Sequence, residues 1–577
     1  MNDFLSIYFI ALIIITAIPV VIYSFGYLEE YKTGYSIKYF WVIMMIFLIS
    51  MAGVVLSVNG ISFIVFWELM SLSSFFLVIF EYKKSENIES GIMYFIMTHI
   101  SGLFIMIMFI LISRYTGISD FRIAAGCMNK LDYMHINIIL ILALLGFGAK
   151  AGLVPLHAWL PKAHPSAPSN VSALMSGIML KIALYGFIRV CFIFTNNTPV
   201  WFGILVLTAG TLTALFGILN ALFQNDIKKL LAFSSIENVG LIFGTLGLAL
   251  VLRSFGNDLL SNIALTAALF HILNHAVFKS LLFMGAGSVL FAASTKNMNE
   301  LGGLYKKMRL VAGCTFIGIM GIGAIPPLNG FASEILILGS FIQGLSVIKN
   351  PAVSLVIIFC GIILALTSGG VVWAFVKCFG TTFLGEPRSK KAVDLKEIPK
   401  SMNAGMMVLA FLTVVLGVFS PILINYIFKG ISNDWNINIA SFEITVAALL
   451  FFIVTALIFI YTRKILKGST AVQETWGCGF NNFKPYIQYS PEGFVQPAIR
   501  MFGSIVSYKK EVKIKDTVYV KGRIGDIVES NIYFRVTSFF DFIASRVIKI
   551  HYGKIQIYVS YIFISLIISI ILVIKFV

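Results

Sequence analysis

Ionisable side chains recur inside long apolar segments of this chain. The set comprises two carboxylates, four lysines and two histidines: Glu68, Lys150, Lys181, His271, His275, Lys279, Glu334 and Lys377. A charge at the centre of a bilayer costs about 2.5 to 3.5 kcal/mol even on lenient insertion scales. A chain that keeps several such groups is predicted to use them, and acids, lysines and histidines in series are typical of an ion or proton path.

The composition indicates a polytopic, all-α membrane protein. Of the 577 residues, 59% are hydrophobic and only 12% are charged, which lies outside the balance of soluble globular chains. Apolar stretches long enough to span a bilayer predict about fourteen crossings. They lie near residues 4–24, 38–58, 61–81, 91–113, 136–160, 170–194, 201–222, 230–252, 262–292, 308–346, 351–384, 402–427, 440–462 and 556–576.

Basic residues set the predicted orientation. Most of the net charge of +17 comes from Lys and Arg in every second loop, as at 388–400 and 463–467. The positive-inside rule therefore predicts a multi-pass protein of the cell membrane with both termini outside the cytoplasm. Because the start has no basic n-region and no small-residue cleavage site, the first helix is expected to stay. The basic residues flank lipid spans, so a nucleic-acid partner is not needed to explain them.

The cysteines and glycines exclude several classes of cofactor. The six cysteines contain no CxxC and no His/Cys ligand spacing, which leaves zinc and iron–sulfur sites without support. A glycine-rich phosphate loop, a Walker lysine and a haem motif are also missing from the sequence. The chain is predicted to carry no cofactor, no metal and no redox or catalytic centre of its own.

Two segments of the core combine helix breakers with an ionisable residue. Glycine and proline surround Lys150 within 146–161, and they precede Glu334 within 321–334. Unwound backbone is tolerated at membrane depth only where it is buried or wet. A pair of such breaks at corresponding positions is typical of inverted repeats with a site at the midplane.

The chain is predicted to divide into six parts. These are an N-terminal helix (1–37), two inverted five-helix repeats (38–194 and 201–384), two further helices (385–462), a basic cytoplasmic segment (463–555) and a final span (556–577).

Glu68 and Lys150 are predicted to interact. Glu68 has apolar neighbours over more than two turns on both sides, although an interfacial glutamate near a loop is the alternative. Lys150 lies too deep to reach either interface, so its expected partner is a carboxylate such as Glu68. A nearby carboxylate favours the protonated lysine and burial favours the neutral one, so a shift between the two conditions would load and release a proton.

The remaining positions extend this prediction. Lys181 lies mid-helix without an adjacent acid, which suits a lysine that is partly neutral. His271, His275 and Lys279 follow i, i+4, i+8 spacing on one helix face. A lone histidine is usually a satisfied core residue, but this stripe indicates a relay with titratable steps.

Glu334 and Lys377 would continue the relay into the second half. Lys377 lies near a helix end, where snorkelling is the ordinary behaviour of a lysine. Accessory positions are His157, Lys228 and Glu237, of which Glu237 is equally a capping or interfacial acid.

Several long motifs carry a family resemblance. Segments that resemble the antiporter-like subunits of respiratory complex I and of multisubunit sodium/proton antiporters are 148–161, 163–174, 226–235 and 326–334. Further segments resemble one branch, the large membrane subunits of formate hydrogenlyases and related energy-converting nickel–iron hydrogenases: 67–74, 235–240, 271–287, 383–389, 475–479, 488–489 and 494–497.

The resemblance implies a subunit that translocates protons, or exchanges sodium for protons, beside other membrane subunits. A separate cytoplasmic redox arm would drive it, and those partner subunits would carry iron–sulfur clusters and a nickel–iron centre. By motif, the resemblance implies that Glu68 and Lys150 are the acid–lysine pair and that Lys181 is the central lysine. It implies that His271, His275 and Lys279 belong to the bridging helix. Glu334 would be the terminal residue. Two helices that usually precede the segment matching Asn2 are missing, so an earlier start or a neighbouring polypeptide is expected to supply them.

The tail predicts an interfacial helix. Between 525 and 550, apolar residues fall on one helical face: Val536, Phe539, Phe540, Ile543, Val547 and Ile550. We expect this helix to lie along the cytoplasmic surface, as the lateral helix does in some relatives.

Two other functions stay open at this stage. One is a subunit of a stand-alone sodium/proton antiporter, and the other is a non-conducting membrane anchor. The coupling ion also stays open, because lysines and histidines suit protons while unwound backbone beside Glu334 could ligate sodium.

Overall fold

The computed structural model describes residues 2–121, 123, 126–195, 198–432, 442–466, 488–504, 508–514, 518–525 and 533–548. The chain divides into two compact units, Met1–Phe502 and Gly503–Val577. The predicted final span and the segment 475–479 lie outside the described residues.

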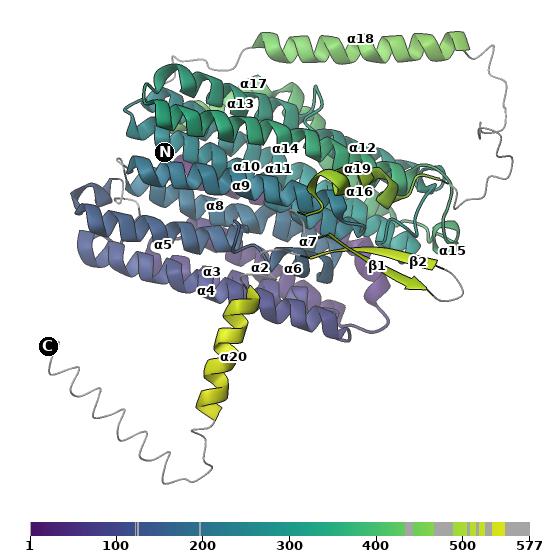
Figure 1. Cartoon of the computed structure of the whole chain (residues 1–577), viewed down its shortest axis with the longest axis horizontal. Coiled ribbons are helices and arrows are strands. Elements are labelled where there is room, and N and C mark those ends of the chain that lie inside the picture. The colour runs from purple at the N-terminus through teal and green to yellow at the C-terminus, as the bar shows by residue number, and fades with distance from the viewer. Residues whose placement is uncertain are drawn as a thin grey trace. The chain divides into compact units, whose positions relative to one another are not determined.

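The first unit is a bundle of long helices that run side by side (Figure 1). Among the described residues, twelve helices are long and apolar enough to cross a membrane, and they correspond to the first twelve predicted spans. They are α1 (Asn2–Tyr27), α2 (Ile37–Leu56), α3 (Gly60–Val78), α4 (Ser85–Thr116), α5 (Tyr133–Ala151), the compound helix Ser169–Phe194, α9 (Val200–Phe223), α10 (Ile227–Ser254), α11 (Asp258–Ala293), α13 (Asn329–Val347), α14 (Pro351–Phe383) and α16 (Lys400–Val418). The all-α, multi-pass membrane fold is thereby confirmed.

Shorter elements connect these helices. They are η1 (Leu28–Tyr31), η2 (Cys127–Lys130), α6 (Leu160–Ser166), η5 (Leu304–Lys306), α12 (Arg309–Ile322), α15 (Lys390–Val393), α17 (Ser420–Ser432) and α19 (Pro491–Phe502). The thirteenth predicted span corresponds to α18 (Phe442–Leu466), a helix of 25 residues.

Both predicted helix breaks are present. α5 ends at Ala151, and Gly152 follows with a φ of 89°, a left-handed conformation that glycine adopts without a Cβ clash. The chain becomes helical again at Leu160. The second break separates α12 from α13, and the 14 residues of α12 are too few to span a bilayer alone. The inverted relation between the two repeats stays a prediction.

The compound helix Ser169–Phe194 is wound unevenly. It consists of α7 (Ser169–Leu174), the π turn η3 (Met175–Met179), α8 (Leu180–Ile188) and a second π turn, η4 (Arg189–Phe194). Single π turns are rare inside α-helices and frequently accompany functional sites. This helix is buried along its whole length, and most of α10 and α11 is buried too. These three helices form the centre of the bundle, whereas α4 and α14 expose much of their apolar surface.

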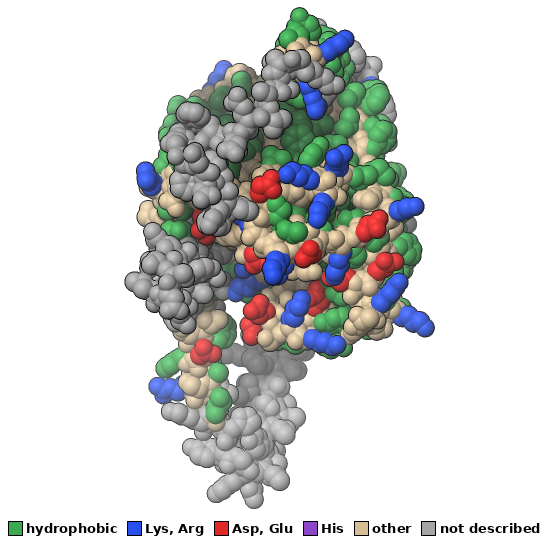
Figure 2. Space-filling view, turned by 90° about the vertical axis from the view of Figure 1, so that its right-hand side faces the viewer, with side chains coloured by type: hydrophobic (Ala, Val, Ile, Leu, Met, Phe, Trp, Pro, Cys, Tyr) green, Lys and Arg blue, Asp and Glu red, His purple; other side chains and the backbone are tan. Residues whose placement is uncertain are grey.

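Charged loops gather at one end of the bundle. Figure 2 views that end and shows basic and acidic side chains intermixed on it, with apolar side chains at its flanks. Ion pairs there join Lys306 to Glu386, Lys391 to Glu300 and Lys396 to Glu30. Which side of the membrane this end faces stays a prediction.

The second unit contains elements of a different kind. Strands β1 (Tyr508–Ile514) and β2 (Val518–Ile524) pair antiparallel, with Tyr508 opposite Ile524. Sequence patterns did not predict this hairpin. Helix α20 (Phe534–Ile548) falls within the predicted interfacial segment and exposes Phe539, Phe540 and Ile543. Its placement at a membrane surface stays a prediction.

Candidate functional site

Among the described residues, five lysines are buried inside the bundle. They are Lys150, Lys181, Lys228, Lys279 and Lys377, each no more than 1% exposed. In the part of the chain that the structure describes, none of them forms an ion pair with a carboxylate. Each ammonium group donates to uncharged oxygens instead. These hydrogen bonds satisfy the buried donors without fixing a negative charge beside them.

Lys150 and Glu68 attract each other, as predicted, but they form no direct ion pair among the described residues. Lys150 Nζ lies 2.9 Å from Ser71 Oγ and 3.1 Å from the hydroxyl of Tyr94. Ser71 is fully buried, whereas the side chain of Glu68, three residues earlier on α3, is 35% exposed. The helix therefore turns the hydroxyl, and not the carboxylate, toward Lys150. Glu68 acts on Lys150 only through longer-range Coulomb attraction.

Glu68 pairs with a residue that sequence reasoning missed. His99 Nε2 on α4 lies 3.2 Å from Glu68 Oε2. A Cβ at Gly102 would overlap the Glu68 carboxylate, so the glycine makes room for this pair between α3 and α4. His99 lies inside the predicted span 91–113, and the search for ionisable residues within spans could have found it.

Lys181 lies beside a π turn. Its Nζ donates to the carbonyl oxygen of Ser176, five residues earlier and inside η3. The hydroxyl of Ser176 in turn lies 2.8 Å from that of Ser235 on α10. The π turn thus presents backbone and side-chain oxygens of one residue to two different helices.

The histidine–lysine stripe on α11 is buried as predicted and contacts α10 and α13. The rings of His271 and His275 are almost parallel, with centroids 6.3 Å apart. His271 Nε2 lies 3.0 Å from Asn238 Oδ1 on α10, and its Nδ1 lies 2.9 Å from Ser333 Oγ on α13. Lys279 Nζ donates to Ser234 Oγ at 2.5 Å and to the Leu231 carbonyl at 3.0 Å.

These contacts form a continuous polar row, which we define as Lys279, Ser234, Asn238, His271 and Ser333. Asn238 connects the two ends of the row. Its amide donates to the Ser234 carbonyl at 2.9 Å, and its side-chain oxygen faces His271. The row joins the consecutive helices α10 and α11 to α13.

Two carboxylates adjoin the row, one at its middle and one at its Ser333 end. Glu237 is buried within α10 and accepts a hydrogen bond from Asn238. It is therefore neither a helix cap nor an interfacial acid. Glu334 follows Ser333 on α13, and its Oε2 accepts a 2.7 Å hydrogen bond from Ser368 Oγ on α14.

His275 lacks a hydrogen-bond partner among the described residues. Both of its ring nitrogens are buried and meet no hydrogen-bonding atom there, and the same holds for His164 in α6. Buried polar groups are nearly always bonded, so the natural partner for these nitrogens is water. A water beside His275 would lie between His271 and Lys279 on the same helix face.

Lys377 and Lys228 are placed at helix ends. Lys377 Nζ donates to the carbonyls of Leu222 and Gln224, where α9 ends. Lys228 donates to the carbonyl of Ala167, just past α6. Lys377 is fully buried, so the alternative of a snorkelling lysine is wrong. Among the described residues, the hydrogen bonds of these two lysines do not reach the polar row. The ring of His157 packs edge-on against Phe216.

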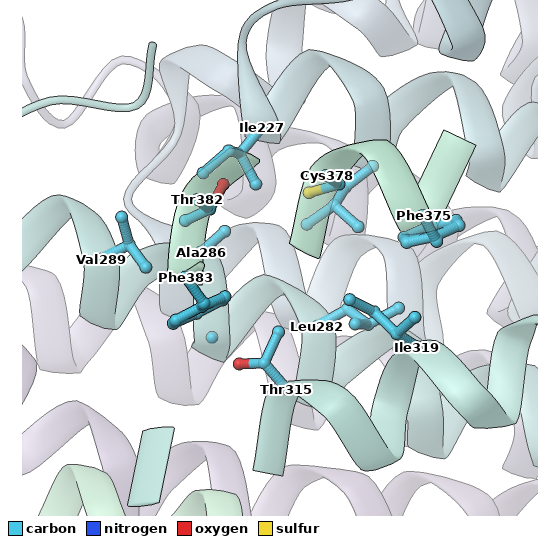
Figure 3. A pocket seen from close by; sticks show the side chains of 12 residues that line it. Ile227, Leu282, Ala286, Val289, Thr315, Ile319, Phe375, Cys378, Thr382 and Phe383 are labelled. Atoms are coloured by element: carbon cyan, nitrogen blue, oxygen red, sulfur yellow. The ribbon is translucent and has the colours of Figure 1, made fainter. Parts of the chain in front are cut away.

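A small cavity of about 20 Å³ lies between α11, α12 and α14. Its lining is mostly aliphatic and aromatic, as in Leu282 and Phe375 (Figure 3). The hydroxyls of Thr315 and Thr382 supply its polar atoms. None of the predicted ionisable residues lines it, but it adjoins the Lys279 end of the polar row, because Leu231 and Phe375 line it and both contact Lys279.

Comparisons with known proteins place this geometry in context. A family model described as "NADH:quinone oxidoreductase/Mrp antiporter, TM" matches residues 57–364. Hydrogenase-4 component B of Escherichia coli is 37% identical over 530 residues, covering 88% of this chain and 78% of the relative. Formate hydrogenlyase subunit 3 of the same species is 32% identical over 455 residues, covering 78% and 72%.

A solved structure shares the fold. The chain is similar to one in the membrane-bound sulfane sulfur reductase, an archaeal respiratory membrane complex, with a TM-score of 0.79 at 21% identity. The match covers 98% of this chain and 88% of that one.

Proposed function

The chain belongs to the NADH:quinone oxidoreductase/Mrp antiporter family of membrane subunits, and we propose that it moves protons within a membrane-bound nickel–iron hydrogenase or a related complex I-like oxidoreductase. The observation that carries this proposal is the polar row from Lys279 through Asn238 to His271 and Ser333. Hydrogen-bonded groups in a low-dielectric interior polarise one another, and histidine and lysine can each take up and give back a proton.

The buried lysines suit this function because their partners are neutral. A lysine in an ion pair gives up its proton only by leaving an uncompensated anion behind, which is costly in a buried site. Lys181 and Lys279 donate to carbonyl and hydroxyl oxygens, and these groups stay neutral when the lysine loses its proton.

The proposed partners are other membrane subunits and a cytoplasmic redox arm. That arm would carry the iron–sulfur clusters and the nickel–iron centre, whereas this chain would hold no redox centre. Similarity to hydrogenase-4 component B and to formate hydrogenlyase subunit 3 supports this assembly. In the proposed orientation the charged end of Figure 2 faces the cytoplasm and both termini lie on the other side.

The experiment compares proton movement with assembly. The complex is purified through this chain, reconstituted in vesicles and given its electron donor, and acidification of the lumen is followed with a pH dye. Lys181→Ala should abolish the gradient while the redox subunits still copurify and turn over. Lys349→Ala, which changes an exposed loop lysine, is the matched control and should pump normally. A full gradient with Lys181→Ala would contradict the proposal.

Function as a subunit of a sodium/proton antiporter is the second candidate, because the matching family also includes Mrp antiporters. Mass spectrometry of the copurifying proteins separates the two. Recovery of hydrogenase-like and ferredoxin-like subunits supports the redox-driven pump. Recovery of small membrane subunits alone, together with sodium-dependent proton flux, supports the antiporter.

A further inference from the structure

An ionisable pair lies apart from the polar row, on the outer side of α3 and α4. The side chains of Glu68 and His99 are 35% and 39% exposed, and both residues lie near the middle of their helices. The pair therefore sits at membrane depth but on the flank of the bundle, where a charged group is costly unless it has a use.

The backbone fixes which nitrogen of His99 carries hydrogen. Nδ1 lies 2.9 Å from the carbonyl oxygen of Phe95, one turn earlier on α4. A carbonyl oxygen only accepts hydrogen bonds, so Nδ1 is the protonated nitrogen. In a neutral imidazole Nε2 is then a bare acceptor, and Nε2 is the nitrogen that faces Glu68.

The contact between Glu68 and His99 therefore needs a proton. Nε2 and Oε2 lie 3.2 Å apart, and without a hydrogen between them two acceptors would face each other. The proton can reside on Nε2, as imidazolium against carboxylate, or on Oε2, as carboxylic acid against neutral imidazole. In either form the pair holds one proton.

Lys150 is a second cationic partner for Glu68. Its ammonium group bonds Ser71, one turn from Glu68 on α3, and Tyr94, which lies on the same helix as His99. Both partners are neutral, so the positive charge of Lys150 has no contacting anion among the described residues. Helix α4 packs against α3, α5 and α6. The charged groups that act on Glu68 are His99 on α4 and Lys150 on α5, while the titratable groups of α6 are Lys162 and His164.

We propose that Glu68 and His99 together store one proton, and that loss of this proton releases Glu68 from His99 toward Lys150. The inference rests on the proposed function and deepens it. On release, the bond between Nε2 and its hydrogen breaks and the proton passes to a water molecule. Glu68 remains an anion and accepts a hydrogen bond from the ammonium of Lys150. Uptake reverses these steps, and the total charge of the three side chains changes by one.

The chain contains a matched control for this chemistry. Asp132 and His135 form another carboxylate–imidazole ion pair. They lie at the start of α5, where Asp132 caps the helix through the backbone of His135. A substitution there removes a histidine of the same kind outside the proposed path.

The test measures proton translocation by the reconstituted complex between about pH 5 and pH 8, the range in which histidine ordinarily titrates. His99→Gln cannot store the proton, so its rate should fall about tenfold or more and lose its dependence on pH in this range. His99→Arg keeps a permanent donor against Glu68 and should be inactive at every pH, although the complex assembles. His135→Gln should reproduce the wild-type profile.

Each outcome bears on the inference. A wild-type pH profile in His99→Gln, or an active His99→Arg, overturns it, because a merely structural histidine would be replaceable by another donor. Copurification of the redox subunits with each variant separates these results from misassembly. Absence of any gradient in the wild-type complex would instead overturn the proposed function.

Discussion

Lys377 Nζ lies 2.5 Å from the carbonyl oxygen of Leu222 and donates a hydrogen bond to it at the end of α9. Lys377 belongs to α14 and follows Leu222 by 155 residues. It also donates to the carbonyl of Gln224 at 2.7 Å. The last carbonyls of a helix have no partner within that helix, and a buried helix end needs donors from elsewhere. The position of Lys377 therefore indicates a role in stability.

Replacement of Lys377 should affect stability before proton movement. Lys377→Met would leave the buried carbonyl of Leu222 and the partly buried carbonyl of Gln224 without this donor, at a cost of about 1 to 3 kcal/mol for the buried one. We expect a lower unfolding temperature of the purified chain, measured by intrinsic fluorescence, and near-normal behaviour of Lys377→Arg. A Lys377→Met variant of full stability that pumps no protons would instead place Lys377 in the relay.

Asn238 should be the most sensitive uncharged position of the polar row. Asn238→Leu keeps the size of the side chain but removes the contacts to His271 and Ser234. We expect translocation to fall about tenfold or more, because a relay is interrupted at its narrowest point. Asn220→Leu is the control, since Asn220 is a buried asparagine of α9 whose amide bonds only its own helix, at the carbonyl of Phe216. Equal losses in both variants would argue for a packing effect.

The contact between Tyr94 and Lys150 should affect the rate of proton movement. Tyr94→Phe removes one of the two oxygens that Lys150 Nζ contacts and leaves Ser71. We expect an assembled complex with a reduced rate of proton movement. Tyr8→Phe provides the comparison, because the Tyr8 hydroxyl is also buried and donates to the carbonyl of Leu269, away from Lys150. A rate equal to that of the wild type in Tyr94→Phe would show that Ser71 alone suffices.

Glu300 should make the folding stability of the charged end depend slightly on pH. The hydrogen bond from Lys391 lowers the pKa of Glu300 below its ordinary value of 4.5. A depressed pKa adds stability above the ordinary value, and this stability is lost as the pH falls through the lowered one. Both side chains are partly exposed, so solvent screening limits the effect to about 0.5 kcal/mol.

Glu300→Gln tests this directly. At pH 7 the variant should unfold at a slightly lower temperature than the wild type. The difference should shrink as the pH falls below the ordinary pKa of 4.5 and vanish below the lowered pKa. A difference that persists unchanged in acid would assign the effect to the backbone contacts of this loop, such as the bond from Ser389 to the Glu300 carbonyl.

The positions of the spans and of both helix breaks were predictable because they follow from local composition. Apolar runs determine where a chain can cross a membrane, and glycine and proline around Lys150 and before Glu334 determine where helices stop. The stripe His271, His275, Lys279 was predictable because its spacing matches the helical period.

The partners of these residues were not predictable in the same way. Every residue carries a carbonyl, so no pattern marks Ser176 or Leu222 as the acceptor for a lysine. The π turn at Met175–Met179 has no distinctive composition, and it determines where Lys181 points. The rotation of α3 placed Ser71, and not Glu68, against Lys150. His99 differs from these cases, because its type and position were visible in the sequence.

The neutral partners of the buried lysines have a consequence for genetics. When a lysine of this kind is replaced by a neutral side chain, no buried anion is left behind, and stranded charge is the main reason that broken ion pairs prevent folding. We therefore expect living cells to tolerate neutral replacements of Lys150 and Lys181, whereas Lys279 also attracts the buried carboxylate Glu237. Growth phenotypes of such strains would then report lost proton flux rather than lost protein.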